Sequence, residues 1–176
     1  MVEITGTALS LAIGGASSGK SRWAEAQAEA TGLPRLYIAT AEAHDAEMEA
    51  KIAAHKASRG DGWTTVEAPH DLAPALGRVP SGHVVVIDCL TLWLTNRMLA
   101  DADLAAETDA LLAALAACPG PVIAVTNEVG QGIVPEHRLG RRFRTAQGAL
   151  NQAVAAQADR VALVVAGLPL WLKGGP

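Results

Sequence analysis

Short apolar runs alternate along the chain with longer segments in which apolar residues recur every three or four positions. The short runs are typical of strands and the longer segments of amphipathic helices. The predicted strands are residues 8–13, 35–40, 63–67, 83–88, 121–126 and 161–166. The predicted helices are residues 20–30, 45–58, 90–100, 104–117 and 138–158. The runs HVVVID and PVIAVT are almost continuously apolar, which favours strands buried on both faces of a parallel sheet.

Strands that alternate with helices at this spacing predict βαβ units, and therefore an α/β fold with a mainly parallel sheet that the strand 161–166 closes. The chain has 176 residues, half of them hydrophobic and 18% charged. This length is that of one ordinary domain with a packed core. No repeat or flexible linker divides the sequence, so we expect a single domain over residues 1–176.

Composition excludes several classes of protein. A net charge of −4 argues against a general nucleic-acid-binding protein. Cys89 and Cys118 have no metal-ligand spacing and are predicted to be buried free thiols of a reducing compartment. The longest uncharged stretch, residues 161–172, falls short of the roughly 18 residues that cross a membrane. The first residues show no secretory signal. We therefore expect a cytoplasmic protein without a membrane span.

The segment GGASSGKS matches the phosphate-binding pattern G-x-x-x-x-G-K-[ST], and it lies between a predicted strand and a predicted helix. Its members are Gly14, Gly15, Ala16, Ser17, Ser18, Gly19, Lys20 and Ser21. The glycines let main-chain N–H groups surround phosphate, and the helix N-terminus adds positive potential. Lys20 is expected to reach the β- and γ-phosphates and the Ser21 hydroxyl to coordinate Mg²⁺. The segment therefore predicts a nucleotide site.

Asp88 ends the strand HVVVID, at the edge of the sheet where ligands of α/β proteins bind. A carboxylate in this place is typical of a second Mg²⁺ ligand. The alternative is that Asp88 only caps the following helix near Thr91.

Two histidines are candidate nucleophiles beside this site. Neutral imidazole attacks phosphorus readily near pH 7, so either His44 or His55 has the required chemistry. A histidine on a charged helix is also commonly a solvated surface residue. Spacing alone does not choose between the two.

Arg138, Arg141 and Arg142 share one face of the long predicted helix 138–158. They are either solvated or a clamp for a phosphate group. The preceding loop, residues 126–135, follows a buried strand and is expected at the ligand-binding edge of the sheet.

Four segments together resemble the cobinamide kinase/cobinamide-phosphate guanylyltransferase family of adenosylcobalamin biosynthesis. The segments are GGASSGKSRWAE, YIATAEAHDAEMEAKIAAHKASRGDGW, VVVIDCLTLWLTN and VTNEVGQGIVPEHRLGRRFR. The similarity runs from about residue 10 to about residue 167, and the fourth segment is specific to this family.

The resemblance implies a P-loop NTPase-like, three-layer, RecA-like fold and two activities. The first phosphorylates adenosylcobinamide with ATP or GTP. The second transfers GMP from GTP to adenosylcobinamide phosphate through a guanylyl-histidine, with Mg²⁺. The family also implies a homo-oligomer, a trimer in its best-known form, and Trp93 and Trp171 are candidates for a subunit contact.

Residues carried over from the resemblance extend the nucleotide site beyond the phosphate-binding loop. They are Thr40, Ala41, Glu42, Ala57, Ser58, Arg59, Gly60, Glu67 and Asp88. Some members carry two adjacent histidines, the first of which is guanylylated; here these positions are Ala54 and His55. We expect His55 to be the nucleophile and keep His44 as the alternative. Two rival functions are a P-loop small-molecule kinase without guanylyltransferase activity and a nucleotide-dependent switch ATPase.

Overall fold

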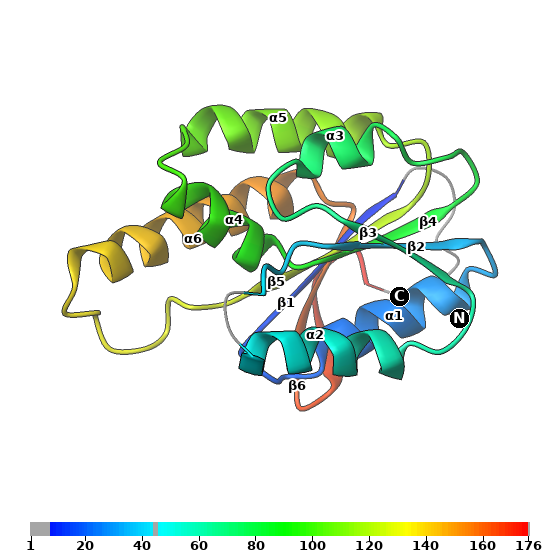
Figure 1. Cartoon of the computed structure of the whole chain (residues 1–176), viewed down its shortest axis with the longest axis horizontal. Helices are drawn as coiled ribbons and strands as arrows, with labels where there is room; N and C mark the ends of the chain where they lie inside the picture. Colours follow the sequence, from blue (N-terminus) through cyan, green and yellow to red (C-terminus); the bar gives the residue numbers. More distant parts are fainter. Residues whose placement is uncertain (1–7, 44–45, 176) are drawn as a thin grey trace.

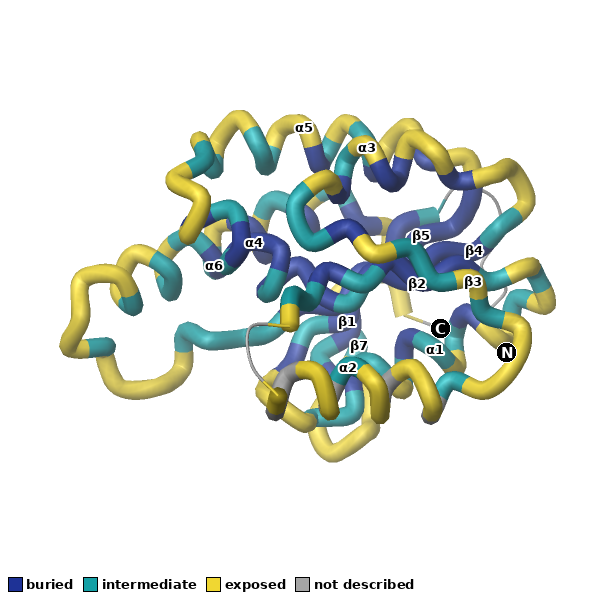
Figure 2. Tube along the Cα trace, in the orientation of Figure 1, coloured by how far each residue is buried: buried dark blue, intermediate teal, exposed yellow. Residues whose placement is uncertain are grey.

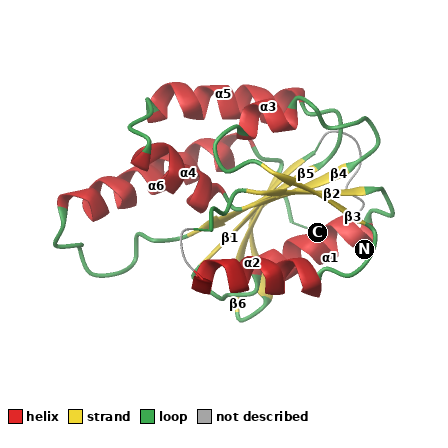
Figure 3. Cartoon of the chain, viewed as in Figure 1, coloured by secondary structure: helices red, strands yellow, loops and turns green. Residues whose placement is uncertain are grey.

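A seven-stranded sheet forms the middle layer of the molecule, with helices packed on both sides (Figures 1 and 3). The computed structural model describes residues 8–43 and 46–175. The strands are β1 (Leu9–Gly14), β2 (Arg35–Ala39), β3 (Trp63–Glu67), β4 (Val84–Asp88), β5 (Val122–Asn127), β6 (Arg160–Val165) and β7 (Leu168–Lys173). The helices are α1 (Lys20–Ala30), α2 (Ala46–Ser58), α3 (Leu72–Leu76), α4 (Leu90–Leu99), α5 (Leu104–Ala117) and α6 (Arg138–Gln157).

The strand order is β3-β2-β4-β5-β1-β6-β7. The first six strands are parallel, so their carboxyl ends meet at one edge of the sheet. In the centre β5 lies between β1 and β4, and Asn127 at its end is level with Gly14 of β1. This arrangement brings the phosphate-binding loop, the end of β5 and Asp88 together, and it confirms the predicted α/β class.

The structure corrects the expected end of the sheet. Residues 161–166 are not its last strand, because β7 follows a two-residue turn and pairs antiparallel with β6. Ala166 and Gly167 make this turn with φ of 52° and 79°. Pro169 lies in β7, where it is tolerated because the strand is at the edge of the sheet. The short helix α3 was also not predicted.

Two apolar clusters pack on the two faces of the sheet. One includes α4, α5 and α6 side chains, and the other includes Ala24 and Ala28 of α1. Trp93 is only 2% exposed and belongs to the first cluster, so the expectation that it forms a subunit contact is wrong. Trp171 is half-buried and packs edge-on against Trp23, with ring centres 5.7 Å apart.

The loop after β5 and the first turns of α6 extend away from the rest of the molecule (Figure 1). They are largely exposed, as Figure 2 shows, and Ile133 is 97% exposed. Arg141 donates to the carbonyls of Pro135 and Glu136, and Arg144 to that of Gly130. These two arginines therefore hold the loop against α6.

The two cysteines are buried and free, as expected. Among the described residues, no helix combines the length and the apolar character needed to cross a membrane.

Candidate active site

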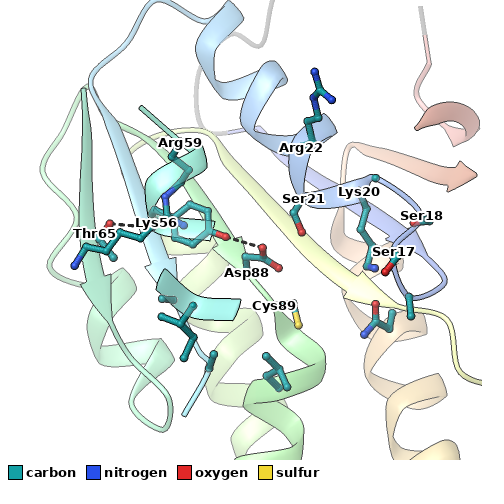
Figure 4. A pocket seen from close by; sticks show the side chains of 18 of the residues that line it. Ser17, Ser18, Lys20, Ser21, Arg22, Lys56, Arg59, Thr65, Asp88 and Cys89 are labelled. Carbon is teal, nitrogen blue, oxygen red and sulfur yellow. Dashed lines mark hydrogen bonds between the residues drawn. The ribbon is translucent and has the colours of Figure 1, made fainter. Parts of the chain in front are cut away.

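The phosphate-binding loop joins β1 to α1 and forms one wall of a cavity of about 650 Å³ (Figure 4). Gly19 has φ of 92°, and a Cβ there would lie 2.9 Å from the Cα of Gly167. A Cβ on Gly14 would lie 2.5 Å from the carbonyl oxygen of Val164. The main chain of β6 and of the turn after it thus approaches the loop so closely that only glycine fits at both positions.

Lys20 begins α1 and is only 8% exposed. Its ammonium donates to the carbonyl of Gly15 at 2.8 Å, which places the charge inside the curve of the loop. Burial lowers the pKa of Lys20, while its electrostatic interactions with Cys89 and Asp88 oppose this shift. A partly desolvated cation in this place is suited to binding the β- and γ-phosphates of a nucleotide.

Asp88 and Ser21 face the same space as Lys20 (Figure 4). The Tyr37 hydroxyl donates to Oδ2 of Asp88 at 2.6 Å, so the carboxylate is held from the sheet side. Burial, followed by the charge of Asp88 and this hydrogen bond, raises the pKa of Tyr37 and keeps it a donor. Asp88 does not cap α4, whose N-cap is Cys89. The capping alternative is therefore wrong.

The opposite wall is built by α2 and β3. Ile52 and Lys56 line the cavity from α2, Arg59 lines it from the turn directly after α2, and Thr65 and Glu67 line it from β3. The Arg59 guanidinium lies 3.6 Å from the centre of the Tyr37 ring and donates to the Thr65 hydroxyl at 3.4 Å. This stacking joins the end of α2 to the same tyrosine that holds Asp88.

Cys89 also lines the cavity, next to Asp88. Its main-chain N–H donates to the Thr40 hydroxyl, which in turn donates to the Cys89 carbonyl, at 2.8 and 2.7 Å. Burial, with the charge of Asp88, raises the pKa of Cys89 to about 11. The thiol is therefore neutral near pH 7 and is a poor nucleophile.

The structure brings together only part of the predicted nucleotide site. Of the predicted residues, those that line the cavity are Ala16, Ser17, Ser18, Gly19, Lys20, Ser21, Ala41, Arg59, Glu67 and Asp88. Those not among the lining residues are Gly14, Gly15, Thr40, Glu42, Ala57 and Gly60. His44 lies outside the described residues, and the side chains of His55 and Ser58 are likewise outside the described part.

Two of these predicted residues have other partners. Thr40 is fully buried and holds Cys89, as described above. Glu42 lies 2.8 Å from Nε2 of His70. Several lining residues were not predicted individually, among them Tyr37 and Thr65. Asn127 lies in the segment 126–135, which was expected at the ligand-binding edge because it comes at the end of a buried strand, but it was not singled out.

The fold and the site define a P-loop nucleotide-binding protein of the RecA-like type. The crystal structure of the RadB recombinase has the same fold, with a TM-score of 0.52 and 17% sequence identity over 90% of this chain and 74% of that one.

The chain belongs to the cobinamide kinase/cobinamide phosphate guanyltransferase (CobU) family, which it matches over residues 10–172. It is 48% identical to the bifunctional adenosylcobalamin biosynthesis protein CobP of Pseudomonas aeruginosa, over 94% of this chain and 98% of that protein. It is 41% identical to the bifunctional protein CobU of Escherichia coli, over 93% and 98%. The protein is therefore a kinase and guanylyltransferase of cobalamin biosynthesis.

Proposed function

We propose that this chain phosphorylates the aminopropanol hydroxyl of adenosylcobinamide with ATP or GTP and then guanylylates the product through His55. The observation that carries this proposal is a single cavity with the phosphate-binding loop on one wall and α2 on the other. Position 55 is three residues after Ile52 on α2, and Ile52 lines the cavity. Positions spaced in this way share one face of a helix, which supports His55 over His44.

In the guanylyl step the His55 imidazole attacks the α-phosphorus of GTP, the bond to the β-phosphate breaks, and pyrophosphate leaves with the electron pair. Cobinamide phosphate then displaces the histidine and gives adenosylcobinamide-GDP. Lys20 and the main-chain N–H groups of the loop stabilise the charge on the leaving pyrophosphate. Lys56 and Arg59, on the opposite wall, are placed to bind the phosphate of the incoming substrate.

Ser21 and Asp88 fit the metal ion that these reactions require. A hydroxyl and a carboxylate are hard oxygen ligands, and Mg²⁺ in proteins commonly has one or two such ligands together with waters and phosphate oxygens. Both side chains line the cavity beside Lys20. When bound, Mg²⁺ neutralises negative charge on the phosphates.

The remaining predictions concern the whole chain. We propose one domain over residues 1–176, a cytoplasmic location that suits two free thiols, and a homo-oligomer, a trimer by family resemblance. The homo-oligomer is supported by exposed apolar side chains on two separate parts of the surface. These are Ile133 and Val134 after β5, and Leu168 and Leu170 on β7. Contacts between unlike patches form a closed ring when the rotation between successive subunits closes. The molar mass of the protein in solution tests the proposed trimer, which should have three times the mass of one chain.

The proposed nucleophile is tested by labelling with GTP that carries the label on its α-phosphate. We expect label on the denatured wild-type protein and on His44→Ala, and none on His55→Ala. The label should be lost in acid and kept in base, as a phosphoramidate is. A wild-type protein without label would contradict the guanylyl-histidine, and label on His55→Ala but not on His44→Ala would move the nucleophile to His44.

A further inference from the structure

Asn127 ends β5, the strand that lies between the phosphate-binding strand β1 and the Asp88 strand β4. It is level with Gly14. Asn127 lines the cavity together with Lys20 and Asp88. An amide therefore lies at the edge of the sheet between the cation of the loop and the carboxylate.

The main chain of Asn127 is fixed by side chains from two helices. Its N–H donates to the Thr91 hydroxyl of α4 at 2.8 Å. Its carbonyl accepts from the Asn151 amide of α6 at 3.0 Å. Both backbone hydrogen-bonding groups of Asn127 are thus held by side chains, which leaves the residue little freedom to shift.

A buried polar network lies behind these contacts. Gln147 and Thr126 are fully buried, and Thr91 and Asn151 are each 6% exposed. The Thr126 hydroxyl donates to Oδ1 of Asn151 at 2.7 Å, and the Gln147 amide donates to both, at 3.0 and 2.8 Å. Buried polar groups are costly unless bonded, and a bonded network makes its surroundings rigid. The rigid element here is the end of β5.

The side chain of Asn127 has bonding capacity left over. Its Oδ1 is buried and has no hydrogen-bond partner within the described part of the chain. The terminal amide carries both donors and an acceptor, and either end can be turned toward a ligand. The nearest ligand group expected is the terminal phosphate, because the Lys20 ammonium at the Gly15 carbonyl marks where the β- and γ-phosphates bind.

We infer that the Asn127 amide is a catalytic residue of the kinase reaction, where it donates a hydrogen bond to the phosphoryl group in transfer. The inference rests on the proposed binding of the nucleoside triphosphate by the loop. In this step the cobinamide hydroxyl oxygen bonds to the γ-phosphorus, and the bond from that phosphorus to the β–γ bridging oxygen breaks. The nucleoside diphosphate leaves with the electron pair, and the hydroxyl proton passes to water.

The same amide has a smaller part in the guanylyl reaction. There the bond that breaks lies between the α- and β-phosphates, and the terminal phosphate is a bystander. A contact that is equally strong in the ground state and the transition state leaves the rate of the chemical step unchanged. Loss of the Asn127 amide should therefore slow the kinase reaction much more than the guanylyl reaction, whereas loss of the Lys20 charge should slow both.

The test compares Asn127→Ala with wild type in three measurements: kinase kcat and KM, the rate of guanylyl-enzyme formation from GTP, and Tm. We expect kinase kcat to fall roughly 100-fold, as for loss of one preorganised donor. KM for the nucleotide and the guanylylation rate should change less than about fivefold. The reason is that the hydrogen bond from Asn127 is stronger in the kinase transition state than in the bound ground state. Asn127→Asp is nearly the same size as wild type and should fold normally. It should be a slower kinase than Asn127→Ala, since its carboxylate repels phosphate.

Asn96→Ala is the matched control, because Asn96 is buried, donates to the carbonyls of Thr40 and Pro69, and is not among the lining residues. It should lower Tm and reduce both rates in the same proportion. Equal loss of both rates in the Asn127 variants, or unchanged kinase kcat, would overturn the inference. A wild-type protein that fails to phosphorylate cobinamide would instead contradict the proposed function.

Discussion

The two walls of the cavity differ in how firmly they are held. On the loop wall, α1 buries Lys20, Ala24 and Ala28, and the loop touches the main chain of β6 and of the turn after it. On the opposite wall, none of the α2 side chains that the structure describes is fully buried (Figure 2). Arg59, which directly follows α2, is joined to the sheet by its stacking on Tyr37 and its hydrogen bond to Thr65.

The firmer packing of the loop wall suits the chemical role of its residues. Groups that stabilise phosphate charge work best when they are fixed before the substrate binds, and such groups lie on the loop wall. The proposed nucleophile, His55, serves only the guanylyl reaction, and segments with few buried contacts are those that rearrange most readily. We therefore expect changes to the loop wall to abolish both activities, and changes to the α2 wall to affect the guanylyl reaction more.

The largest effect should follow Lys20→Met, which keeps the shape of the side chain and removes its charge. We expect both activities to fall by about 1,000-fold, because the same cation stabilises both leaving groups. The Tm should be unchanged or higher, since burial lowers the pKa of Lys20 and its charge therefore opposes folding of the free protein. The control is Lys56→Met on the α2 wall. If Lys56→Met lowers kinase activity as strongly as Lys20→Met does, the two walls contribute equally to the kinase reaction.

The loop wall was also the part best predicted from the sequence. A strand, a glycine-rich loop and a helix form one local unit, so α1 begins and ends where the pattern places it, at Lys20 and Ala30. The buried Val and Ile runs gave the central strands, and Asp88 followed from its position at the end of one of them. Local patterns were sufficient here because neighbours in the sequence are neighbours in the site.

The features missed depend on contacts between distant segments. Gln147 and Asn151 lie on α6 four residues apart, and a polar pair of this kind usually marks a solvated helix face. Here both are buried because Thr126 and Asn127 of β5 are their partners. The strand β7 was missed because Gly167 and Pro169 are typical of a break, and only pairing with β6 makes the segment a strand.

A smaller and more selective effect is expected from Arg59→Ala on the α2 wall. It removes both the stacking on Tyr37 and the hydrogen bond to Thr65. A desolvated cation–π contact contributes roughly 1–2 kcal/mol, so we expect guanylyl-enzyme formation to slow about tenfold and kinase kcat to change less than about threefold. Both rates are measured on the same preparation.

Arg35→Ala is the matched control for Arg59. Arg35 also lies over an aromatic ring, 5.4 Å from the centre of Trp63, but it is not among the residues that line the cavity. Its loss should lower stability without separating the two rates. A kinase loss as large as the guanylyl loss in Arg59→Ala would show that this arginine serves the shared phosphate site.

The smallest effect concerns Tyr37, which touches both walls through Asp88 and Arg59. Tyr37→Phe removes the hydrogen bond to Asp88 and should lower the free energy of unfolding near pH 8 by about 1 kcal/mol. Both activities should fall by less than about tenfold, because the carboxylate remains in place but is less firmly held. The ring remains, so the stacking of Arg59 should remain as well.

The pH dependence isolates this hydroxyl. Burial, followed by the charge of Asp88, raises the pKa of Tyr37, whereas an unfolded tyrosine titrates near pH 10. The unfolded state therefore loses the proton first, and the stability contributed by Tyr37 is complete below about pH 10 and declines above it, by at most about 1.4 kcal/mol per pH unit. Unfolding curves of wild type and Tyr37→Phe should thus converge above about pH 10. Tyr37 is the one tyrosine of the chain, so tyrosinate absorbance reports it directly. Absorbance that rises near pH 10 in the folded protein would contradict the buried hydrogen bond.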